Sequence, residues 1–436
     1  DGRSETLIGE VLSELVAAGR IARENVIIVT KAGYVQGQNY EMVQARKAAG
    51  RPFPNLVKVK AGLDHCIHPE FLADQLTRSL ERLQLETIDV FLLHNPEYYL
   101  SWAHVANIPL HEARREYYRR IKLAFQYLET EVAQGRIQWY GISSNTFPII
   151  KIDAQFTSLE RVWEIAESLL ANHHFRIIQM PLNLFETGGV TNINLNDDHS
   201  TLSFARQKNL GVLINRPLNA YHKNTLIRLV DVLPSSYPTT PEEVSTVVDT
   251  LVDDETVFQQ HWLPTLDIDA DTRRQLQAYL AVGQVLQGQW GSFYSYHNWL
   301  EIQSQFLLPR AQAAITFLSN QENLADGLLT WLHGYIERVN DCLGAVSAFY
   351  QEAGHERAQR MQQTAVSAES AWAAETLSQT AVRSLRSSAG ISAVLVGMRQ
   401  VRYVDDMLSE LKRPVTVKDR DEAWLKLSKM RDEIVL

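Results

Sequence analysis

The chain has 436 residues, with 42 Lys and Arg against 51 Asp and Glu, so its formal net charge is −9. Hydrophobic residues make up 45% and charged residues 21%, which is typical of a globular protein and excludes a largely disordered, collagen-like or coiled-coil chain. The acidic balance argues against nucleic-acid binding, because no excess of basic side chains is available to meet phosphates.

The two cysteines and the hydropathy pattern bear on the compartment. Cys66 and Cys342 are far apart and give no disulfide framework, which favours a reducing compartment, either the cytoplasm or the interior of an organelle. No apolar run is long enough to span a membrane, and no signal peptide is visible.

Taken in chain order, helical periodicity alternates with short β-branched runs. The chain opens on an amphipathic helix with Ser4 as its N-cap and an apolar face of Leu7, Ile8, Val11, Leu12 and Leu15. Residues 32–68 have no clear period and predict a loop excursion. Further helices are expected at 69–83, 112–134, 158–171, 199–208 and 375–386. Strands are expected at 25–31, 88–93, 138–142, 175–178, 210–214 and 391–396.

The alternation of buried strands with helices predicts a parallel sheet. A polar residue falls at or just after the carboxyl end of each strand: Lys31, His94, Ser143, Gln179, Asn215 and Arg399. In a (β/α)8 barrel that edge carries the functional site. An open doubly wound sheet is the alternative, but it would want a glycine-rich phosphate turn after its first strand, and Lys31-Ala32-Gly33-Tyr34 is not one. The sequence therefore favours the barrel.

Six strands do not close such a barrel, which takes eight. A sheet left open would expose two raw edges, which folded proteins avoid. We therefore expect the barrel to be incomplete at its amino-terminal side as the sequence stands. Two β/α units would precede Asp1, or another chain would supply them.

Seven short motifs, each at a strand end or helix start, together resemble the aldo-keto reductases. They are Gly2-Arg3-Ser4-Glu5 with Ile8-Gly9, Val29-Thr30-Lys31, Ile88-Asp89 through Leu92-Leu93-His94, Gly141-Ile142-Ser143-Ser144-Asn145, Gln179-Met180-Pro181-Leu182-Asn183, Asn215-Arg216-Pro217-Leu218 and Val396-Gly397-Met398-Arg399. The resemblance covers about 1–220 and 374–412 and leaves out 226–373. It implies a (β/α)8 barrel of this family with NADP(H), or alternatively NAD(H), as cofactor and an aldehyde or ketone as small-molecule substrate.

The resemblance assigns the catalytic roles of Lys31 and His94. The family's set is an Asp, a Tyr, a Lys and a His, and the Asp and Tyr would lie upstream of Asp1. The Tyr protonates the carbonyl oxygen, a buried Lys lowers its pKa, the Asp holds the Lys, and the His orients the carbonyl. The residues taken alone leave other roles open: Lys31 as a strand-end lysine that reaches solvent and His94 as a core histidine.

The resemblance also implies the cofactor and substrate contacts. Ser143, Ser144, Asn145 and Gln179 would bind the nicotinamide carboxamide, although the sequence does not decide which of the three after Ile142 does so, and polar helix caps are the alternative. Asn215 stands where many members place a stacking aromatic, and Arg216 would cover the ring or reach the pyrophosphate. The cofactor set is completed by Pro217, Leu218, Gly397, Met398, Arg399, Arg402 and Asp406, with Arg399 pairing with a 2′-phosphate or lying as a surface arginine. Tyr34, Asn95 and Trp102, on loops above the site, would contact substrate.

No metal site is expected. His65-Cys66-Ile67-His68 has no ligand pair on one helical face and no second ligand cluster, and the segment is expected to be a loop that lines the pocket.

Three segments follow from these patterns: barrel at 1–225, a helical insertion at 226–373, and the last barrel helix, strand and tail at 374–436. Pro234 to Pro241 reads as a linker, and 240–373 predicts three to five helices. Apolar positions expected on their buried faces are Leu276, Leu280, Trp299, Phe306, Ile315, Leu318, Leu332, Ile336, Val339, Leu343 and Val346. The insertion could pack beside the barrel, close over the site as a lid, or bind a protein partner or a second copy through Trp262, Trp290, Trp299 and Trp331.

The sequence as a whole predicts an NADP(H)-dependent reductase of aldehydes or ketones. The alternative is a catalytically inactive barrel that serves as a structural or cofactor-sensing subunit.

Overall fold

The structure is a computed structural model that describes residues 2–195, 198–222, 225–321 and 324–431. The chain divides into two compact units. The first comprises Asp1–Ala220, Ala368–Trp372 and Ala381–Asp432, and the second comprises Tyr221–Ser367, Ala373–Thr380 and Glu433–Leu436. Within the described residues, no helix combines the length and apolar character needed to cross a bilayer.

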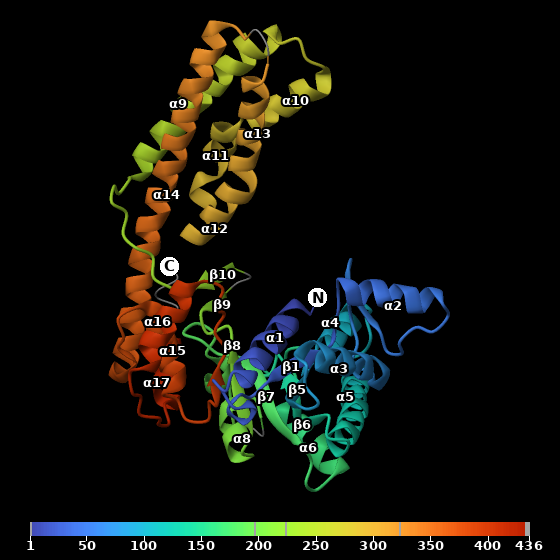
Figure 1. Ribbon diagram of the computed structural model, residues 1–436. Helices are drawn as coiled ribbons and strands as arrows, with labels where there is room; N and C mark the ends of the chain where they lie inside the picture. The colour runs from blue at the N-terminus through green and yellow to red at the C-terminus, as the bar shows by residue number, and fades with distance from the viewer. Residues whose placement is uncertain (1, 196–197, 223–224, 322–323, 432–436) are drawn as a thin grey trace. The chain divides into compact units, whose positions relative to one another are not determined.

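A six-stranded parallel sheet organises the first unit (Figure 1). Its strands, in spatial order, are β1 (Val29–Ala32), β5 (Ile88–His94), β6 (Ile137–Ser143), β7 (Phe175–Pro181), β8 (Gly211–Asn215) and β11 (Ala393–Val394). These are the six strands that the sequence predicts, in the predicted order. In the described part of the chain β1 pairs with β5 and β11 pairs with β8, so the sheet is a half-barrel that does not close.

Alternate residues on the strands face the inside of the half-barrel. Val90, Leu92 and Leu213 form a buried apolar cluster there, with Val29 and Ile177 packed against it. One contact shows that the sheet is curled: Lys31 Nζ lies 3.2 Å from Gln179 Oε1. These residues lie on β1 and β7, which are three strand spacings apart, so roughly 14 Å would separate them in a flat sheet.

Helices cover the outside of the sheet, and their bounds follow local sequence signals. For example, α3 occupies the predicted 69–83, with Pro69 in its first turn, the His68 ring accepting from Glu70 N, and Gln84 in the left-handed conformation after its end. The helices of this unit that precede β8 are α1 (Arg3–Ala17), α2 (Gln38–Ala48), α3 (Pro69–Leu83), α4 (Tyr98–Val105), α5 (Leu110–Ala133), α6 (Leu159–Leu169), α7 (Gly188–Thr191) and α8 (Thr201–Gln207).

The first helix differs from its prediction in which side is buried. Gly9 and Leu12 are its buried positions, because α1 packs so closely on α3 that a Cβ at Gly9 would lie 2.5 Å from the Arg82 carbonyl oxygen. Leu7, Ile8 and Val11 are 61%, 46% and 44% exposed, so most of the predicted apolar face is not covered. The N-cap is Gly2 rather than Ser4, and the hydroxyl of Ser4 lies inside the first turn.

The predicted loop excursion at 32–68 is wrong in detail, because it contains regular structure. Strands β2 (Tyr34–Val35), β4 (Leu63–His65) and β3 (Val57–Lys60) form a small antiparallel sheet beside α2. Val35, Val43, Phe53, Cys66 and Phe71 form its core. The strands are two to four residues long, too short to show an alternating pattern in the sequence.

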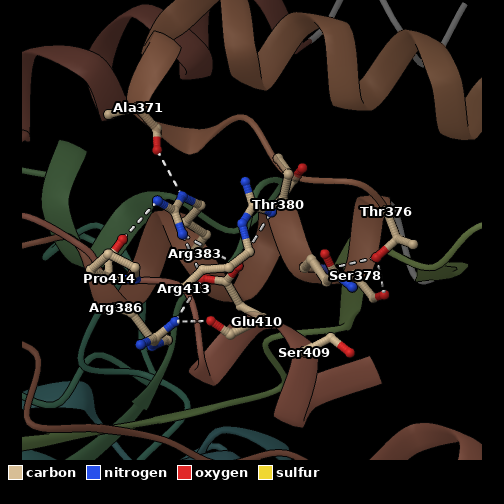
Figure 2. Close-up of polar contacts among 12 residues, drawn as sticks. Ala371, Thr376, Ser378, Thr380, Arg383, Arg386, Ser409, Glu410, Arg413 and Pro414 are labelled. Carbon is tan, nitrogen blue, oxygen red and sulfur yellow. Dashed lines mark hydrogen bonds and ion pairs between the residues drawn. The ribbon is translucent and has the colours of Figure 1, made fainter. Parts of the chain in front are cut away.

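The carboxyl-terminal part of this unit is held by a buried ion cluster (Figure 2). Glu410, at the end of α16 (Val401–Leu411), is 0% exposed, and its Oε1 lies 3.1 Å from Arg383 Nη1 and 2.7 Å from Arg386 Nη1. Arg413 adds a contact at 3.8 Å. Arg383 and Arg386 lie near the end of α15 (Leu377–Arg386), so the cluster joins α15 to α16. Beyond them, α17 (Asp421–Arg431) packs through Trp424 against Trp372.

The second unit is helical and also holds a two-stranded sheet of β9 (Asn219–His222) and β10 (Thr225–Arg228), of which β9 begins in the first unit. Its helices are α9 (Pro241–Val257), α10 (Ala270–Tyr279), α11 (Val282–Gln289), α12 (Tyr296–Ile302), α13 (Leu308–Ser319) and α14 (Asp326–Ala368). The described residues thus hold more α-helices than the predicted three to five. Thr240, the N-cap of α9, and Glu243, three residues later, form a capping box, and Pro241 lies in the first turn between them.

One continuous core fills the helical unit. The predicted positions Leu276, Leu280, Leu318, Leu332, Val339, Leu343 and Val346 are buried in it, whereas Phe306 is 38% exposed beneath the Arg310 guanidinium. The tryptophans that suggested a partner surface belong to this core: Trp299 and Trp331 are buried, and Trp262 and Trp290 pack against it. Their number is therefore explained by packing within the unit.

Candidate functional site

The register of the sheet brings three predicted site residues to one level. His94 on β5 pairs in register with Ser143 on β6, and Ser143 with Gln179 on β7. Residues paired in register on parallel strands project from the same face, so these side chains line the inside of the half-barrel at its carboxyl edge. Asn215, the last residue of β8, pairs with Pro181 two positions further on.

Lys31, on β1, lies at the same level of the half-barrel as His94, Ser143 and Gln179. Its Nζ donates to Gln179 Oε1 at 3.2 Å, and burial lowers the pKa of the ammonium group. Among the described residues no carboxylate oxygen lies within ion-pair distance of Lys31, in contrast to the many surface cations that are paired. A partly buried cation without an acidic partner is costly, and such groups concentrate at functional sites.

His94 is held neutral beside Lys31. Burial, with the charges of Lys31 and His65, lowers the pKa of His94 to about 3. His65 Nε2 donates to the His94 carbonyl oxygen at 2.7 Å, and its own pKa is lowered to about 4, chiefly by burial. Gly33 permits this approach, since a Cβ there would lie 2.5 Å from that carbonyl oxygen. A neutral imidazole in this place donates a hydrogen bond without carrying charge.

Tyr34 and Asn95, predicted to contact substrate, lie against His94. The rings of Tyr34 and His94 are 4.2 Å apart, and Asn95 Nδ2 donates to Tyr34 Oη at 2.6 Å. Tyr34 Oη in turn donates to Tyr98 Oη at 3.3 Å. Burial raises the pKa of Tyr34, so this phenol stays protonated. Trp102 lies on α4 rather than on a loop; it is 37% exposed and packs on Tyr99.

The turn after β6 separates the roles of its three polar residues. Ser144 is 1% exposed, and its hydroxyl lies 3.1 Å from Thr146 Oγ1 and accepts from Thr146 N at 3.1 Å, so it is committed to the protein. Ser143 faces the inside of the half-barrel, and the partly exposed Asn145 has its Oδ1 3.4 Å from Asn215 Nδ2. Ser143 and Asn145 are therefore the two of the three that remain available to a ligand.

The end of β8 carries a buried polar atom that lacks a partner. This atom is Asn215 Oδ1, which has no hydrogen-bond partner in the described part of the chain. Arg216 adopts a left-handed backbone conformation with φ of 56°, and its Nη2 lies 2.6 Å from Glu186 Oε1. This ion pair fixes the guanidinium that was predicted to cover the ring or reach the pyrophosphate. Pro217 is buried and Leu218 partly buried.

The residues predicted to hold the adenosine phosphate lie between β11 and α16 and in the first turns of α16. Met398, Arg399 and Arg402 are exposed, and the Arg402 guanidinium lies 5.1 Å from the Tyr403 ring centroid. Gly397 and Arg399 come before the first turn of α16, whereas Asp406 lies partly buried within that helix.

Two residues of the site, Glu97 and Tyr98, escaped the sequence analysis, although they follow His94-Asn95-Pro96 directly. His65 lies against His94, in the segment expected to line the pocket, but on strand β4 of the antiparallel sheet rather than on a loop. In the described residues no group of three or more His, Cys, Asp or Glu side chains is arranged to hold a metal ion.

Comparison with known proteins places these residues in a family. The model of the aldo/keto reductase family matches residues 1–220, just over half of the chain. No curated protein matches the chain.

Similar solved structures include the aldose reductase of Schistosoma japonicum, at 16% identity and a TM-score of 0.29 over 50% of this chain and 54% of that one. An aldo/keto reductase of Klebsiella pneumoniae in complex with NADP and acetate has 19% identity and a TM-score of 0.27 over 50% of each chain. The holo form of an aldo-keto reductase of Bacillus halodurans has 17% identity and a TM-score of 0.28 over 64% of this chain and 63% of that one. The chain spans about half the length of the first two structures.

Proposed function

Because the chain belongs to the aldo-keto reductase family, we propose that it is an NADP(H)-dependent oxidoreductase that reduces an aldehyde or ketone. The observation that carries the proposal is the meeting of Lys31, His94, Ser143 and Gln179 at one level of the carboxyl edge. A lysine and a neutral histidine beside amide and hydroxyl groups suit a carbonyl that gains negative charge on oxygen. The Klebsiella pneumoniae structures contain NADP or NADPH, which supports the choice of cofactor.

The residues present fit a nicotinamide carboxamide. Asn215 Oδ1 is a buried acceptor without a partner, and it lies on the side chain that also contacts Asn145. An amide N–H is the donor that this atom lacks. Ser143, Asn145 and Gln179 would hold the carboxamide by hydrogen bonds, and exposed Arg399 would pair with a 2′-phosphate. NADPH, when bound, supplies the hydride.

Side chains of this protein orient the carbonyl group and stabilise the charge that develops on its oxygen. Neutral His94 donates a hydrogen bond to the carbonyl oxygen and orients it, and the Lys31 cation favours the negative charge that develops there. Protonation of the carbonyl oxygen needs a donor of lowered pKa, and Tyr34 is unsuited because burial raises its pKa. The resemblance assigns that step to a Tyr, and the pairing with Lys31 to an Asp, and neither is among the motif residues described above.

Purified protein tests the proposal in two stages. NADPH binding is followed by the fluorescence of the reduced nicotinamide, and turnover by loss of its absorbance with a panel of aldehydes and ketones. Binding with turnover is the expected result, with turnover but not NADPH binding lost in His94→Ala or Lys31→Met. Absence of NADPH binding overturns the proposal.

A second candidate is a non-catalytic subunit that binds the cofactor. The observation in its favour is that Lys31 has no carboxylate partner in the described residues, so the proton relay is incomplete there. Tight NADPH binding without turnover of any carbonyl in the panel selects this candidate.

A further inference from the structure

Glu97 is a buried acid that the proposed chemistry does not use. It lies in the turn between β5 and α4, three residues after His94, and is 3% exposed. Its Oε1 accepts from the backbone N of Asn145 at 2.9 Å. Its Oε2 is buried without a hydrogen-bond partner among the described residues. A buried carboxyl oxygen that accepts no hydrogen bond calls for an explanation, because leaving a buried polar atom without a partner costs free energy of folding.

The side-chain hydrogen bond of Glu97 goes to the turn after β6. Its Oε1 accepts from Asn145 N at 2.9 Å, and in the same turn the Ser144 hydroxyl lies 3.1 Å from Thr146 Oγ1 and accepts from Thr146 N. On its other side, Asn145 is held by the 3.4 Å contact of its Oδ1 with Asn215 Nδ2. Asn145 is thus fixed through its backbone by Glu97, in the turn after β5, and through its side chain by β8.

We propose that Glu97 is a positioning residue that, as a carboxylate, holds Ser144 and Asn145 in the arrangement that receives the nicotinamide carboxamide. The inference rests on the proposed function. Glu97 acts through the turn: its Oε1 accepts from the backbone of Asn145, whose side chain faces the ligand.

The surroundings make Glu97 the group of this cluster that titrates near neutrality. Burial raises its pKa to about 7, against the hydrogen bonds from Ser144 and Asn145. The titratable groups that face it are Tyr34 on β2 and Tyr117 on α5, and burial raises the pKa of both, so both stay neutral. His65 and His94 have pKa values of about 4 and about 3 and are neutral as well.

This titration gives the positioning role a direction with pH. Above about pH 7 the carboxylate accepts a charge-assisted hydrogen bond from Asn145 N, and below it the neutral acid accepts a weaker one. The difference predicts that, as pH falls from 8 to 6, the dissociation constant of NADPH rises about fivefold more in the wild type than in Glu97→Gln, whose side chain stays neutral at both values.

The experiment measures NADPH dissociation constants at pH 6 and 8 for the wild type, Glu97→Gln and the control Glu131→Gln. Glu131 is another buried acid, 4% exposed, paired with Arg136 at the opposite end of β6. The 2′-phosphate of NADPH also titrates near pH 6, but it does so equally with all three proteins, so the ratio between proteins is the readout. In parallel, the backbone amide shift of Asn145 is followed against pH in 15N-asparagine-labelled protein without cofactor.

The expected result is a pH response of affinity that is about fivefold larger in the wild type and Glu131→Gln than in Glu97→Gln, where only the titration of the 2′-phosphate remains. The Asn145 amide should titrate near pH 7 in the wild type. If Glu97→Gln is not folded, Ser144→Ala replaces it, and its Asn145 amide should titrate at higher pH because a bond that lowers the pKa is gone. Equal pH responses in all folded proteins overturn the inference and leave the proposed function standing. Absence of NADPH binding at every pH instead overturns the proposed function, and the inference with it.

Discussion

At the amino end of the main sheet, charged side chains are paired, whereas at the carboxyl end several polar groups are not. Arg23 Nη2 lies 2.7 Å from Asp89 at the start of β5, and Glu129 accepts from Tyr140 at 2.8 Å and lies 2.7 Å from His174 Nδ1. At the carboxyl end Lys31 has no described carboxylate partner, and Glu97 Oε2 and Asn215 Oδ1 have no hydrogen-bond partner among the described residues.

The difference separates stability from ligand binding. Paired charges at the amino end satisfy one another and hold helices to strands. Unpaired groups at the carboxyl end lower stability unless a ligand or a further segment supplies the missing partner. Substitutions at the two ends should therefore have opposite consequences, and the experiments below test that, from the largest expected effect to the smallest.

Lys31→Met should produce the largest loss of activity with no loss of stability. Turnover should fall by about 10²- to 10⁴-fold, as for loss of a group that acts in proton transfer. The free energy of unfolding should stay level or rise, because a partly buried cation without a carboxylate partner is replaced by an apolar side chain of similar length. Steady-state rates and urea unfolding measure the two quantities. A protein destabilised by this change would break the comparison.

Glu410→Gln extends the rule for paired charges to the carboxyl-terminal helices. It leaves Arg383 and Arg386 without their common carboxylate at a position that is 0% exposed. The free energy of unfolding of the first unit should fall by about 3–5 kcal/mol, as when one partner of a buried ion pair is removed. Chemical denaturation followed through the buried Trp372 and Trp424 reports it, with an unchanged midpoint as the contrary outcome.

Glu255 sharpens the comparison, because it is a buried acid whose two oxygens are both bonded. They accept from Gly283 N at 2.6 Å and Gln284 N at 3.0 Å, and burial raises the pKa of the carboxyl to about 7. A raised folded pKa adds stability below the unfolded value, and this stability is lost as pH rises through about 7. Between pH 5 and 8 the wild type should lose about 3 kcal/mol of unfolding free energy more than Glu255→Gln.

Urea unfolding of both proteins at pH 5 and pH 8 measures that difference. Glu337→Gln, an exposed acid on α14, is the matched control and should follow the wild type. Parallel pH responses of the wild type and Glu255→Gln would contradict the assignment.

Asp89→Asn tests the amino end directly. The change weakens the bonds from Arg23 Nη2 and Ile28 N, both at 2.7 Å. We expect the free energy of unfolding to fall by about 1–3 kcal/mol, with NADPH affinity unchanged. Thermal unfolding and a cofactor titration give both values, and a loss of affinity equal to the loss of stability would count against the separation of roles.

Asn215→Ala should have the smallest effect. It removes the 3.4 Å contact with Asn145 and the unpartnered Oδ1 together. The two changes oppose each other in stability, so unfolding should shift little. NADPH affinity should fall about two- to fivefold, the worth of one neutral hydrogen bond. Stronger NADPH binding in the variant would show that this atom does not face the carboxamide.

The sequence by itself determined the six strands, most of the helices that follow them, and the placement of Lys31, His94, Ser143, Gln179 and Asn215 at strand ends. These features follow from local periodicity, caps and short motifs, which act within a few residues of chain. The helix at 69–83 shows this best, since Pro69, the apolar stripe and Gln84 fix it locally.

Tertiary structure alone decided the rest. The strands of the small antiparallel sheet are too short for a pattern, so the sequence placed His65 on a loop lining the pocket and not on the strand that carries it. Which side of α1 is buried depended on the close approach of Gly9 to α3, not on hydrophobicity. Ser144 and Asn145 are adjacent polar residues, but the Ser144 hydroxyl bonds to Thr146, whereas the backbone of Asn145 is held by Glu97, 48 residues away, and its side chain stays partly exposed. Such contacts join residues distant in sequence, and no local pattern encodes them.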